Sequence, residues 1–355
     1  MADGEKRRRW TLPLRIGISI LMLALLSTRL PAIDWNDLVP SWSLTTAEWL
    51  LGAVLLTVVA MVLSALRWQQ VLRAMDHHTS LRTLIPLAFA GQFVSNMLPT
   101  TIGGDVLRVS RLSKETGNPA DTFASVVLER LSGWLVLPLI TFFGLLINPE
   151  LRRQGDATLF AVLISTVTLL GLIAILVIAD HPRLGGRFAS REGWTRFVGA
   201  VHLGVARMRS HPAATIGIVV AGLLYQLVLC LAALMVAAAL GFGWLGMTPL
   251  LAFFPAVLIA QVLPIGIAGL GVREGAFVLF LTPLGVPAEQ AIALGLVLYV
   301  VNLVVSLAGA PSFAIGGRRR SRSVADPASG PGTDPGSDPG SGPVPGSEPD
   351  GVPGA

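Results

Sequence analysis

Charged side chains are scarce in this 355-residue sequence and make up only 13% of it. Soluble globular proteins carry about 25% charged residues. Hydrophobic residues reach 53%, and the mean hydropathy is +0.69. So few charges could not cover a surface that faces water. The composition therefore predicts a polytopic membrane protein.

Cysteine is almost absent, and the motifs of common enzymes are missing. The single cysteine, Cys230, lies in an apolar segment, which excludes an internal disulfide framework and any site built from several cysteines. None of the five histidines forms an HExxH pattern, and neither a phosphate-binding P-loop nor a GxSxG motif occurs. We therefore expect no metal and no cofactor. A membrane enzyme remains an alternative, because an Asp or Glu alone can act as a base.

Basic residues slightly outnumber acidic ones, with 26 Lys and Arg against 21 Asp and Glu. They gather in short loops beside apolar runs, as the positive-inside rule describes, and do not suggest a nucleic-acid partner. Both ends carry such clusters, Lys6–Arg9 and Arg318–Arg322. We expect a multi-pass protein of the plasma membrane with both termini in the cytoplasm.

Six apolar runs are long enough to span a bilayer, which takes about 20 residues. They are Leu12–Leu30, Ala47–Leu66, Thr122–Ile147, Ala157–Ala179, Ala213–Leu240 and Ala288–Ile315. Two further stretches, Leu84–Gly104 and Thr248–Val286, are broken by Pro and Gly. The basic loops fall on one side only if each broken stretch crosses an even number of times. The sequence thus predicts an all-α fold of about six to eight transmembrane helices, with each broken stretch a re-entrant hairpin or a pair of short helices.

The two broken stretches resemble each other in sequence. One reads LPTTIGGDVLR and ends at Arg108, and the other reads LPIGIAGLGVR and ends at Arg273, 165 positions later. Leu, Pro, Ile, Gly and Arg occupy the same offsets in both. Because loop charge gives the two motifs opposite orientations, they predict an inverted repeat, which in transporters puts the substrate site at the repeat interface.

These patterns divide the chain into segments. A basic N-terminus (1–11) precedes a transmembrane domain (12–317), whose repeats cover about 12–147 and 157–317. The loop 180–212 is rich in Arg and has helical spacing of apolar residues, so it is either an interfacial amphipathic helix or a plain basic loop. The tail, 318–355, is basic and then rich in Pro and Gly, a composition that predicts disorder.

Several ionisable residues fall at membrane depth, where a charge costs about 2.5–3.5 kcal/mol on insertion scales. They should therefore face each other or a wet cavity. Arg suits phosphate because its planar fork donates two parallel hydrogen bonds. The alternative is that they are structural ion pairs or snorkelling residues at the membrane interface, which we expect for Arg67, Arg111 and Lys114. The candidate substrate-binding residues are Asn96, Gly103, Gly104, Asp105, Arg108, Glu129, Arg130, Gly269, Gly271, Arg273 and Glu274.

In the same order along the chain, Arg67-Trp68, the run from Leu98 to Arg108, Glu129-Arg130 and the run from Pro264 to Glu274 resemble one family. These are the flippase-like membrane proteins related to the transmembrane region of lysylphosphatidylglycerol synthase. The resemblance covers about Leu12 to Gly317. It implies lipid handling, because this region of multiple peptide resistance factors is associated with moving an aminoacylated phospholipid across the bilayer. The aminoacyl-transferase domain of those longer proteins has no counterpart here, so we do not expect lysyl-lipid synthesis.

We therefore expect a lipid transporter of the flippase type, whose partners are membrane lipids with an anionic or zwitterionic headgroup. Two alternatives remain. One is a membrane-embedded transferase acting on lipid-linked substrates, and the other is a scaffold that recruits a soluble synthase through the basic loop 180–212.

Overall fold

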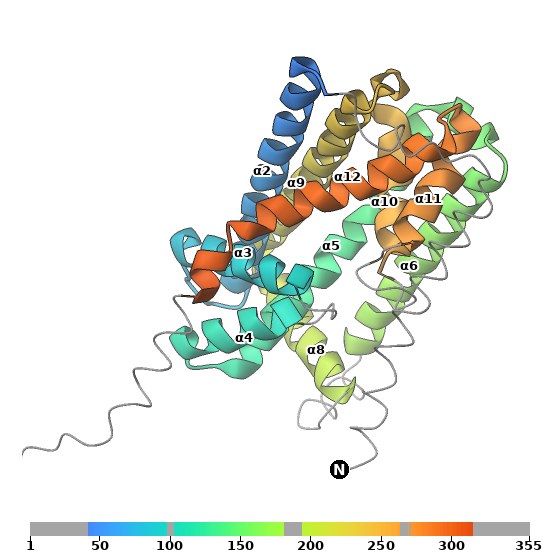
Figure 1. Ribbon diagram of the computed structural model, residues 1–355. Coiled ribbons are helices and arrows are strands. Elements are labelled where there is room, and N and C mark those ends of the chain that lie inside the picture. The colour runs from blue at the N-terminus through green and yellow to red at the C-terminus, as the bar shows by residue number, and fades with distance from the viewer. Residues whose placement is uncertain (1–41, 98–102, 181–193, 263–268, 270, 315–355) are drawn as a thin grey trace, which may run out of the picture. The chain divides into compact units, whose positions relative to one another are not determined.

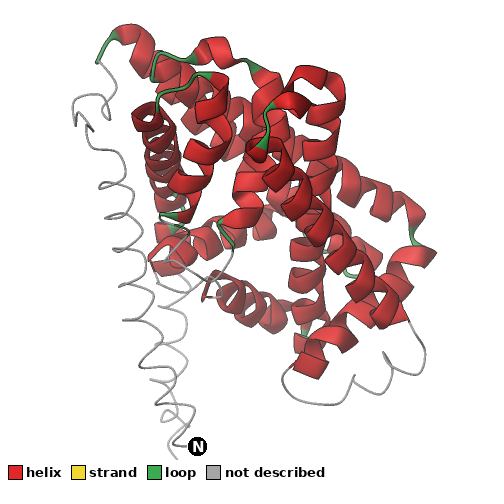
Figure 2. Ribbon diagram, turned by 90° about the vertical axis from the view of Figure 1, so that its right-hand side faces the viewer, coloured by secondary structure: helices red, strands yellow, loops and turns green. Residues whose placement is uncertain are grey.

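The computed structural model describes residues 42–97, 103–180, 194–262, 269 and 271–314. Within these ranges the chain is helical and has no strand (Figure 2). Five of the described helices are long and apolar enough to span a membrane: α2 (Leu44–Ala74), α5 (Pro119–Ile147), α6 (Asp156–Asp180), α9 (Pro212–Ala239) and α12 (Ala288–Leu307). They confirm five of the six predicted spans. The remaining span, Leu12–Leu30, lies outside the described residues.

Four shorter helices lie in or next to the two broken stretches: α3 (Leu81–Met97), α4 (Gly103–Thr116), α10 (Met247–Ala260) and α11 (Val272–Leu281). The longest has 17 residues. At about 1.5 Å per residue, none of the four matches the ~30 Å hydrocarbon core by itself. A new helix begins at or just after the glycines of each motif, since α4 begins at Gly103 and α11 begins directly after Gly271. The motif residues 98–102, 263–268 and 270 are outside the described ranges.

Two helix ends in the two halves of the chain are displaced by the same 165 positions as the sequence motifs. Helix α2 ends at Ala74 and α9 ends at Ala239, while α4 ends at Thr116 and α11 ends at Leu281. The other boundaries of these helices differ by a few residues from that displacement.

Helices α2 and α9 lie side by side (Figure 1). Gly52 of α2 faces Met235 of α9, and Gly217 of α9 faces Gln70 of α2. Residue numbers thus rise along one helix as they fall along the other, so the pair is antiparallel. The two contacts are also equivalent, because Gly217 follows Gly52, and Met235 follows Gln70, by 165 positions.

A second pair of contacts crosses between the two halves of the chain. Gly144 of α5 lies against the backbone of Ala252 in α10, and Gly309 lies against the backbone of Phe89 in α3. A Cβ atom on either glycine would come closer than 3.0 Å to the opposing backbone. These helices can approach so closely only because both positions are glycine, and Gly309 again follows Gly144 by 165 positions.

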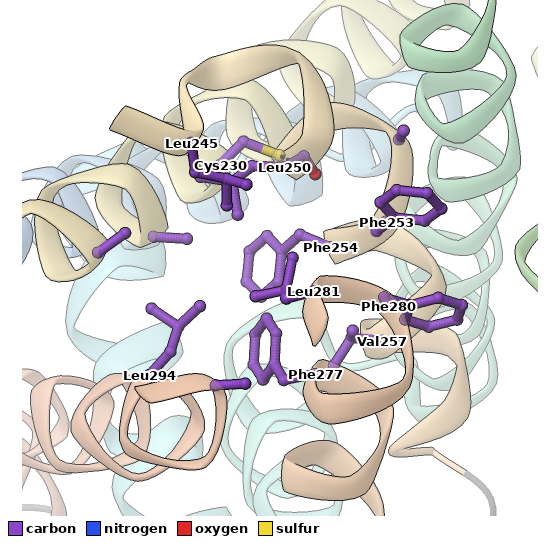
Figure 3. Packing of buried hydrophobic residues seen from close by; sticks show 14 of the residues in the cluster. Cys230, Leu245, Leu250, Phe253, Phe254, Val257, Phe277, Phe280, Leu281 and Leu294 are labelled. Carbon is purple, nitrogen blue, oxygen red and sulfur yellow. Dashed lines mark hydrogen bonds between the residues drawn. The ribbon is translucent and has the colours of Figure 1, made fainter. Parts of the chain in front are cut away.

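The largest hydrophobic cluster gathers where α10 and α11 meet α9 and α12 (Figure 3). Two aromatic pairs hold α10 against α11: the Phe253 and Phe280 rings stack with centroids 5.4 Å apart, and the Phe254 and Phe277 rings with centroids 5.8 Å apart. All four side chains are buried. This packing of α10 against α11 fixes where the first turn of α11 lies.

Polar contacts tie the end of α2 to the start of α5 and to the junction between α8 (Trp194–Ser210) and α9. His77 pairs with Asp121 at 3.0 Å, His211 with Asp76 at 3.2 Å, and the Arg207 guanidinium donates to the Met75 carbonyl at 2.7 Å. Helix α8 covers the residues whose spacing suggested an amphipathic helix. A helix, rather than a plain loop, therefore occupies 194–210, while its place at a membrane interface stays a prediction.

Candidate functional site

A buried carboxylate, that of Glu129, lies at the centre of an ionic cluster formed by α2, α4 and α5. Its Oε1 accepts hydrogen bonds from Arg67 Nε at 3.2 Å and from Arg67 Nη2. Its Oε2 accepts from Arg108 Nη1 at 3.1 Å. Ser64 Oγ adds a bond of 3.3 Å to Oε1. One carboxylate thus joins two guanidinium groups, all three side chains being at most 8% exposed.

The Arg108 guanidinium is held on one edge and free on the other. Its Nη1 binds Glu129 and lies 3.6 Å from Asp105. Its Cζ lies 4.0 Å from the centroid of the Trp68 ring. The Nε and Nη2 atoms are buried and have no hydrogen-bond partner among the described residues. These two atoms form the side of the guanidinium that donates two parallel bonds to an anion, and leaving such donors unpaired costs free energy.

Helix packing brings Arg108 to this place. Gly91 of α3 leaves space for the aliphatic part of the Arg108 side chain, since a Cβ there would lie 3.0 Å from Arg108 Cγ and Cδ. Gly104 of α4 faces the Gly91 carbonyl so closely that a Cβ would lie 2.1 Å from that oxygen. The glycine at position 104 therefore acts through helix packing, and α4 can then project Arg108 toward Glu129.

Asp105 and Arg130 form a second pair beside the first. Arg130 Nε and Nη2 donate to the two Asp105 oxygens at 3.0 and 2.9 Å. The pair is more open than the Glu129 centre, because the Arg130 side chain is 49% exposed. This fork–fork geometry engages both oxygens of the Asp105 carboxylate.

The first turn of α11 carries the corresponding residues of the second motif. Arg273 Nε and Nη2 both donate to Glu274 Oε1, at 3.1 and 2.5 Å. Glu274 Oε2 accepts from the Gly271 backbone N–H at 2.7 Å. Gly269 and Gly271 have φ of +75° and +84°, a region that favours glycine. Arg273 therefore donates through Nε and Nη2 to a carboxylate of its own helix. The same two atoms of Arg108 have no partner among the described residues.

Two adjoining cavities lie between these groups. The inner cavity, of about 300 Å³, is lined by residues of the Glu129 cluster. The outer cavity, of about 900 Å³, is lined by Arg273, Tyr299 and many apolar side chains. Both share a wall that includes Gln92, Asp105, Arg130 and Asn302. The inner cavity, with its charged lining, thus adjoins the larger and mainly apolar outer cavity.

Three amide side chains bridge α3 and α12 along the cavity wall. Asn302 Oδ1 accepts from Gln92 Nε2 at 3.0 Å and from Asn96 Nδ2 at 3.1 Å. Gln92 Nε2 also lies 3.4 Å from Asn96 Oδ1. This amide trio, Gln92, Asn96 and Asn302, joins residues more than 200 positions apart in the sequence.

The candidate residues divide into three groups in space. Asp105, Arg108, Glu129 and Arg130 meet around the inner cavity, Arg273 and Glu274 pair on the far side of the outer cavity, and Asn96 belongs to the amide trio. Gly103, Gly104, Gly269 and Gly271 lie at or just before the starts of α4 and α11. Sequence reasoning left Arg67 out of the candidate set; the structure places it in an ion pair with Glu129 at the ionic centre. Its place next to Trp68 in the family motif was the available signal.

The sequence model of the family described as the lysylphosphatidylglycerol synthase TM region matches residues 13–309. This chain belongs to that family. The match confirms the family resemblance drawn from the motifs, and with the apolar helices it makes the chain a multi-pass membrane protein. No curated protein matches the chain.

The matched range 13–309 includes every residue of the Glu129 cluster, the Arg273–Glu274 pair and the amide trio. The family match and the cavity geometry thus concern the same part of the chain.

Proposed function

We propose that this protein is a lipid transporter that binds a phospholipid headgroup in its inner cavity while the acyl chains occupy the outer one. The observation that carries the proposal is the unpaired edge of Arg108, buried in a cluster where every carboxylate is already engaged. A phosphate would satisfy both donors at once, after movement of the side chains that cover them, because the two atoms have almost no exposed surface. The apolar walls of the 900 Å³ cavity offer suitable surroundings for the chains.

The proposal includes an inverted repeat. Two observations support it: the antiparallel contact of α2 with α9, and the reciprocal glycine contacts of α5 with α10 and of the chain after α12 with α3. An axis that exchanges two antiparallel helices runs perpendicular to them, and therefore in the membrane plane. That symmetry belongs to inverted-repeat transporters, in which substrate binds at the repeat interface.

In this scheme, α3 with α4 and α10 with α11 are re-entrant hairpins that enter from opposite faces. The ends of α2 and α6, the start of α5 and the α8–α9 junction face the cytoplasm, because their flanking segments are the basic ones. The Asn148–Thr248 hydrogen bond, at 3.2 Å, lies at the opposite end of α5 and so on the external side.

A reconstitution experiment tests the transport function. The full chain is placed in liposomes that contain a fluorescent phospholipid, and the labelled lipid that becomes accessible to an external quencher is followed with time. We expect Arg108→Ala to abolish movement, and Arg108→Lys to restore it only in part, since Lys keeps the charge and loses the bidentate edge. Arg153→Ala, an exposed arginine outside both cavities, is the matched control.

The chemical state of the lipid distinguishes a transporter from an enzyme. Lipids are extracted after the assay and analysed by mass spectrometry. Movement without covalent change agrees with the proposal, whereas a new lipid product would favour the transferase alternative. Unchanged movement in Arg108→Ala would show that the phosphate site is wrong.

A further inference from the structure

We propose that two protonated histidines, His77 and His211, form a clamp that holds the end of α2 to its neighbouring helices and loosens as the pH rises. This histidine clamp lies outside both cavities. Its control of lipid movement rests on the proposed function, whereas its dependence on pH does not. Three features carry the proposal: the turn after α2, the hydrogen bonds of His211, and the equivalent turn after α9.

The turn after α2 has a backbone that favours glycine but contains an aspartate. Asp76 has a φ of +63°, the one positive φ among the described residues other than glycine. Its N–H donates to the Arg73 carbonyl at 3.1 Å, and the following N–H donates to the Leu72 carbonyl at 2.9 Å. In this Schellman pattern the left-handed position is usually glycine. A carboxylate is also disfavoured there by the negative end of the helix dipole. Local chemistry therefore does not account for Asp76.

His211, at the start of α9, gives the aspartate a partner. Its Nε2 lies 3.2 Å from Asp76 Oδ1, and its Nδ1 lies 3.2 Å from the Arg207 carbonyl. A carboxylate and a carbonyl only accept hydrogen bonds, so both contacts form only when both ring nitrogens carry hydrogen. The ring is then an imidazolium. Its charge suits this place, because the C-terminal ends of α2 and α8 meet here and helix dipoles favour a cation at that end.

His77 adds a second contact between an imidazole and a carboxylate. Its Nε2 lies 3.0 Å from Asp121 Oδ2 in the first turn of α5, and the two side chains are 24% and 11% exposed. Protonation makes this contact an ion pair, whereas a neutral His77 keeps only the hydrogen bond. The other titratable side chains near this end are exposed and form no ion pair among the described residues: Arg73, His78, Arg82, Lys114 and Glu115.

Arg207 contributes the part of the clamp that does not depend on pH. Its Nη1 donates to the Met75 carbonyl at 2.7 Å and lies 3.8 Å from Asp76 Oδ2. A guanidinium keeps its charge at any physiological pH, so α8 stays on α2 when His211 becomes neutral. A neutral His211 can donate to only one of its two acceptors. Loss of the proton therefore loosens the clamp and does not dissolve it.

The equivalent turn after α9 has the same backbone and no clamp. There, 165 positions later, the Gly241 N–H donates to the Ala238 carbonyl at 3.1 Å, and the Phe242 N–H donates to the Ala237 carbonyl at 2.9 Å. Gly241 has a φ of +87°, and Phe242 is fully buried. Apolar packing thus holds this turn, where polar contacts hold the other. Because α2 and α9 are antiparallel, the clamp acts at one face of the protein only.

The chemistry of histidine sets the direction and size of the effect. Histidine exchanges its proton near pH ~6.5, so the clamp is complete below this pH and weakens as the pH rises toward about 8. A partly exposed ion pair changes an opening equilibrium about threefold, and two such pairs change it about tenfold. In the proposed topology the end of α2 faces the cytoplasm. An acidic cytoplasm would therefore hold that face of the transporter closed.

Amide hydrogen exchange of the full chain in detergent tests the clamp. Rates at about pH 6 and about pH 8 are corrected for the intrinsic effect of pH on exchange. We expect peptides that cover 72–80 to open about tenfold more often at the higher pH, and peptides that cover 237–245, the equivalent turn, to show no change. The double variant His77→Gln with His211→Gln should abolish the response. His78→Gln, at an exposed neighbouring histidine, is the matched control and should keep it.

A glycine variant distinguishes the clamp from a role in the backbone. Asp76→Gly suits the left-handed turn and removes only the carboxylate. We expect the response to pH to fall to about threefold, the part that His77 supplies. A response as large as that of the wild type would show that Asp76 does not act through His211, and would overturn this half of the clamp.

Lipid movement in liposomes shows whether the clamp controls transport. We expect movement to be about tenfold faster at about pH 8 than at about pH 6, and equal at both in the double histidine variant. Exchange of 72–80 that does not respond to pH in the wild type overturns the clamp. If exchange responds and movement does not, the control of transport is overturned and the clamp stands. If the wild type moves no lipid at either pH, the proposed function fails, and the exchange result still decides the clamp.

Discussion

Replacing Glu129 by Gln should destabilise the protein more than any other single loss of charge in the site. Glutamine keeps the shape of the side chain, but it removes the negative charge that serves both Arg67 and Arg108. The Glu129 side chain is 3% exposed, and those of the two arginines are 7% and 8% exposed. Water therefore cannot replace the lost charge. Breaking a buried pair in this way costs about 3–5 kcal/mol.

That loss is a large fraction of the ~5–15 kcal/mol by which folded proteins are stable. Equilibrium unfolding in mixed detergent micelles, followed by tryptophan fluorescence, measures it. Asp105→Asn is the matched control, because Asp105 and its partner Arg130 are 21% and 49% exposed. For a pair open to solvent, we expect no more than ~1 kcal/mol.

A double variant tests the cause of the destabilisation. If uncompensated charge is responsible, the double variant Glu129→Gln with Arg67→Gln should lose less unfolding free energy than the two single variants lose together. The reason is that the double variant no longer contains one of the two arginine charges that Glu129 neutralised. The reasoning is refuted if Glu129→Gln unfolds within 1 kcal/mol of the wild type, or if the two single effects simply add.

Three further predictions concern packing, the tail and topology. Gly104→Ala should reduce thermal stability and lipid movement, because its Cβ would collide with the α3 backbone, while Gly275→Ala, which has open space around it, should leave both unchanged in the same assays. Deleting 325–355 should preserve insertion and transport, since this segment offers no apolar surface for docking; loss of folded protein on gel filtration would contradict this. Cysteines introduced at Lys114 and Pro287 should react with an impermeant reagent from the cytoplasmic and external sides respectively, and labelling of both from one side would exclude opposed hairpins.

The sequence alone determined the class of fold and the positions of most helices. Long apolar runs with few charges can only be membrane spans, so five helices could be predicted without knowing their neighbours. Pro and Gly end helices through local backbone chemistry, so the restarts at Gly103 and Val272 followed from the motifs. The ionisable residues at membrane depth were also evident, because their cost in lipid makes them conspicuous.

Tertiary structure decided which of these residues act together. Arg67 and Glu129 are 62 positions apart, and Gln92 and Asn302 are 210 positions apart. No local pattern encodes such contacts, because they depend on how whole helices pack. The repeat motif treats Arg108 and Arg273 as equivalent, yet Arg273 pairs with its sequence neighbour Glu274, whereas an edge of Arg108 is left without a partner among the described residues. The sequence thus determined which charges enter the membrane, and helix packing decided which guanidinium edge has no partner among the described residues.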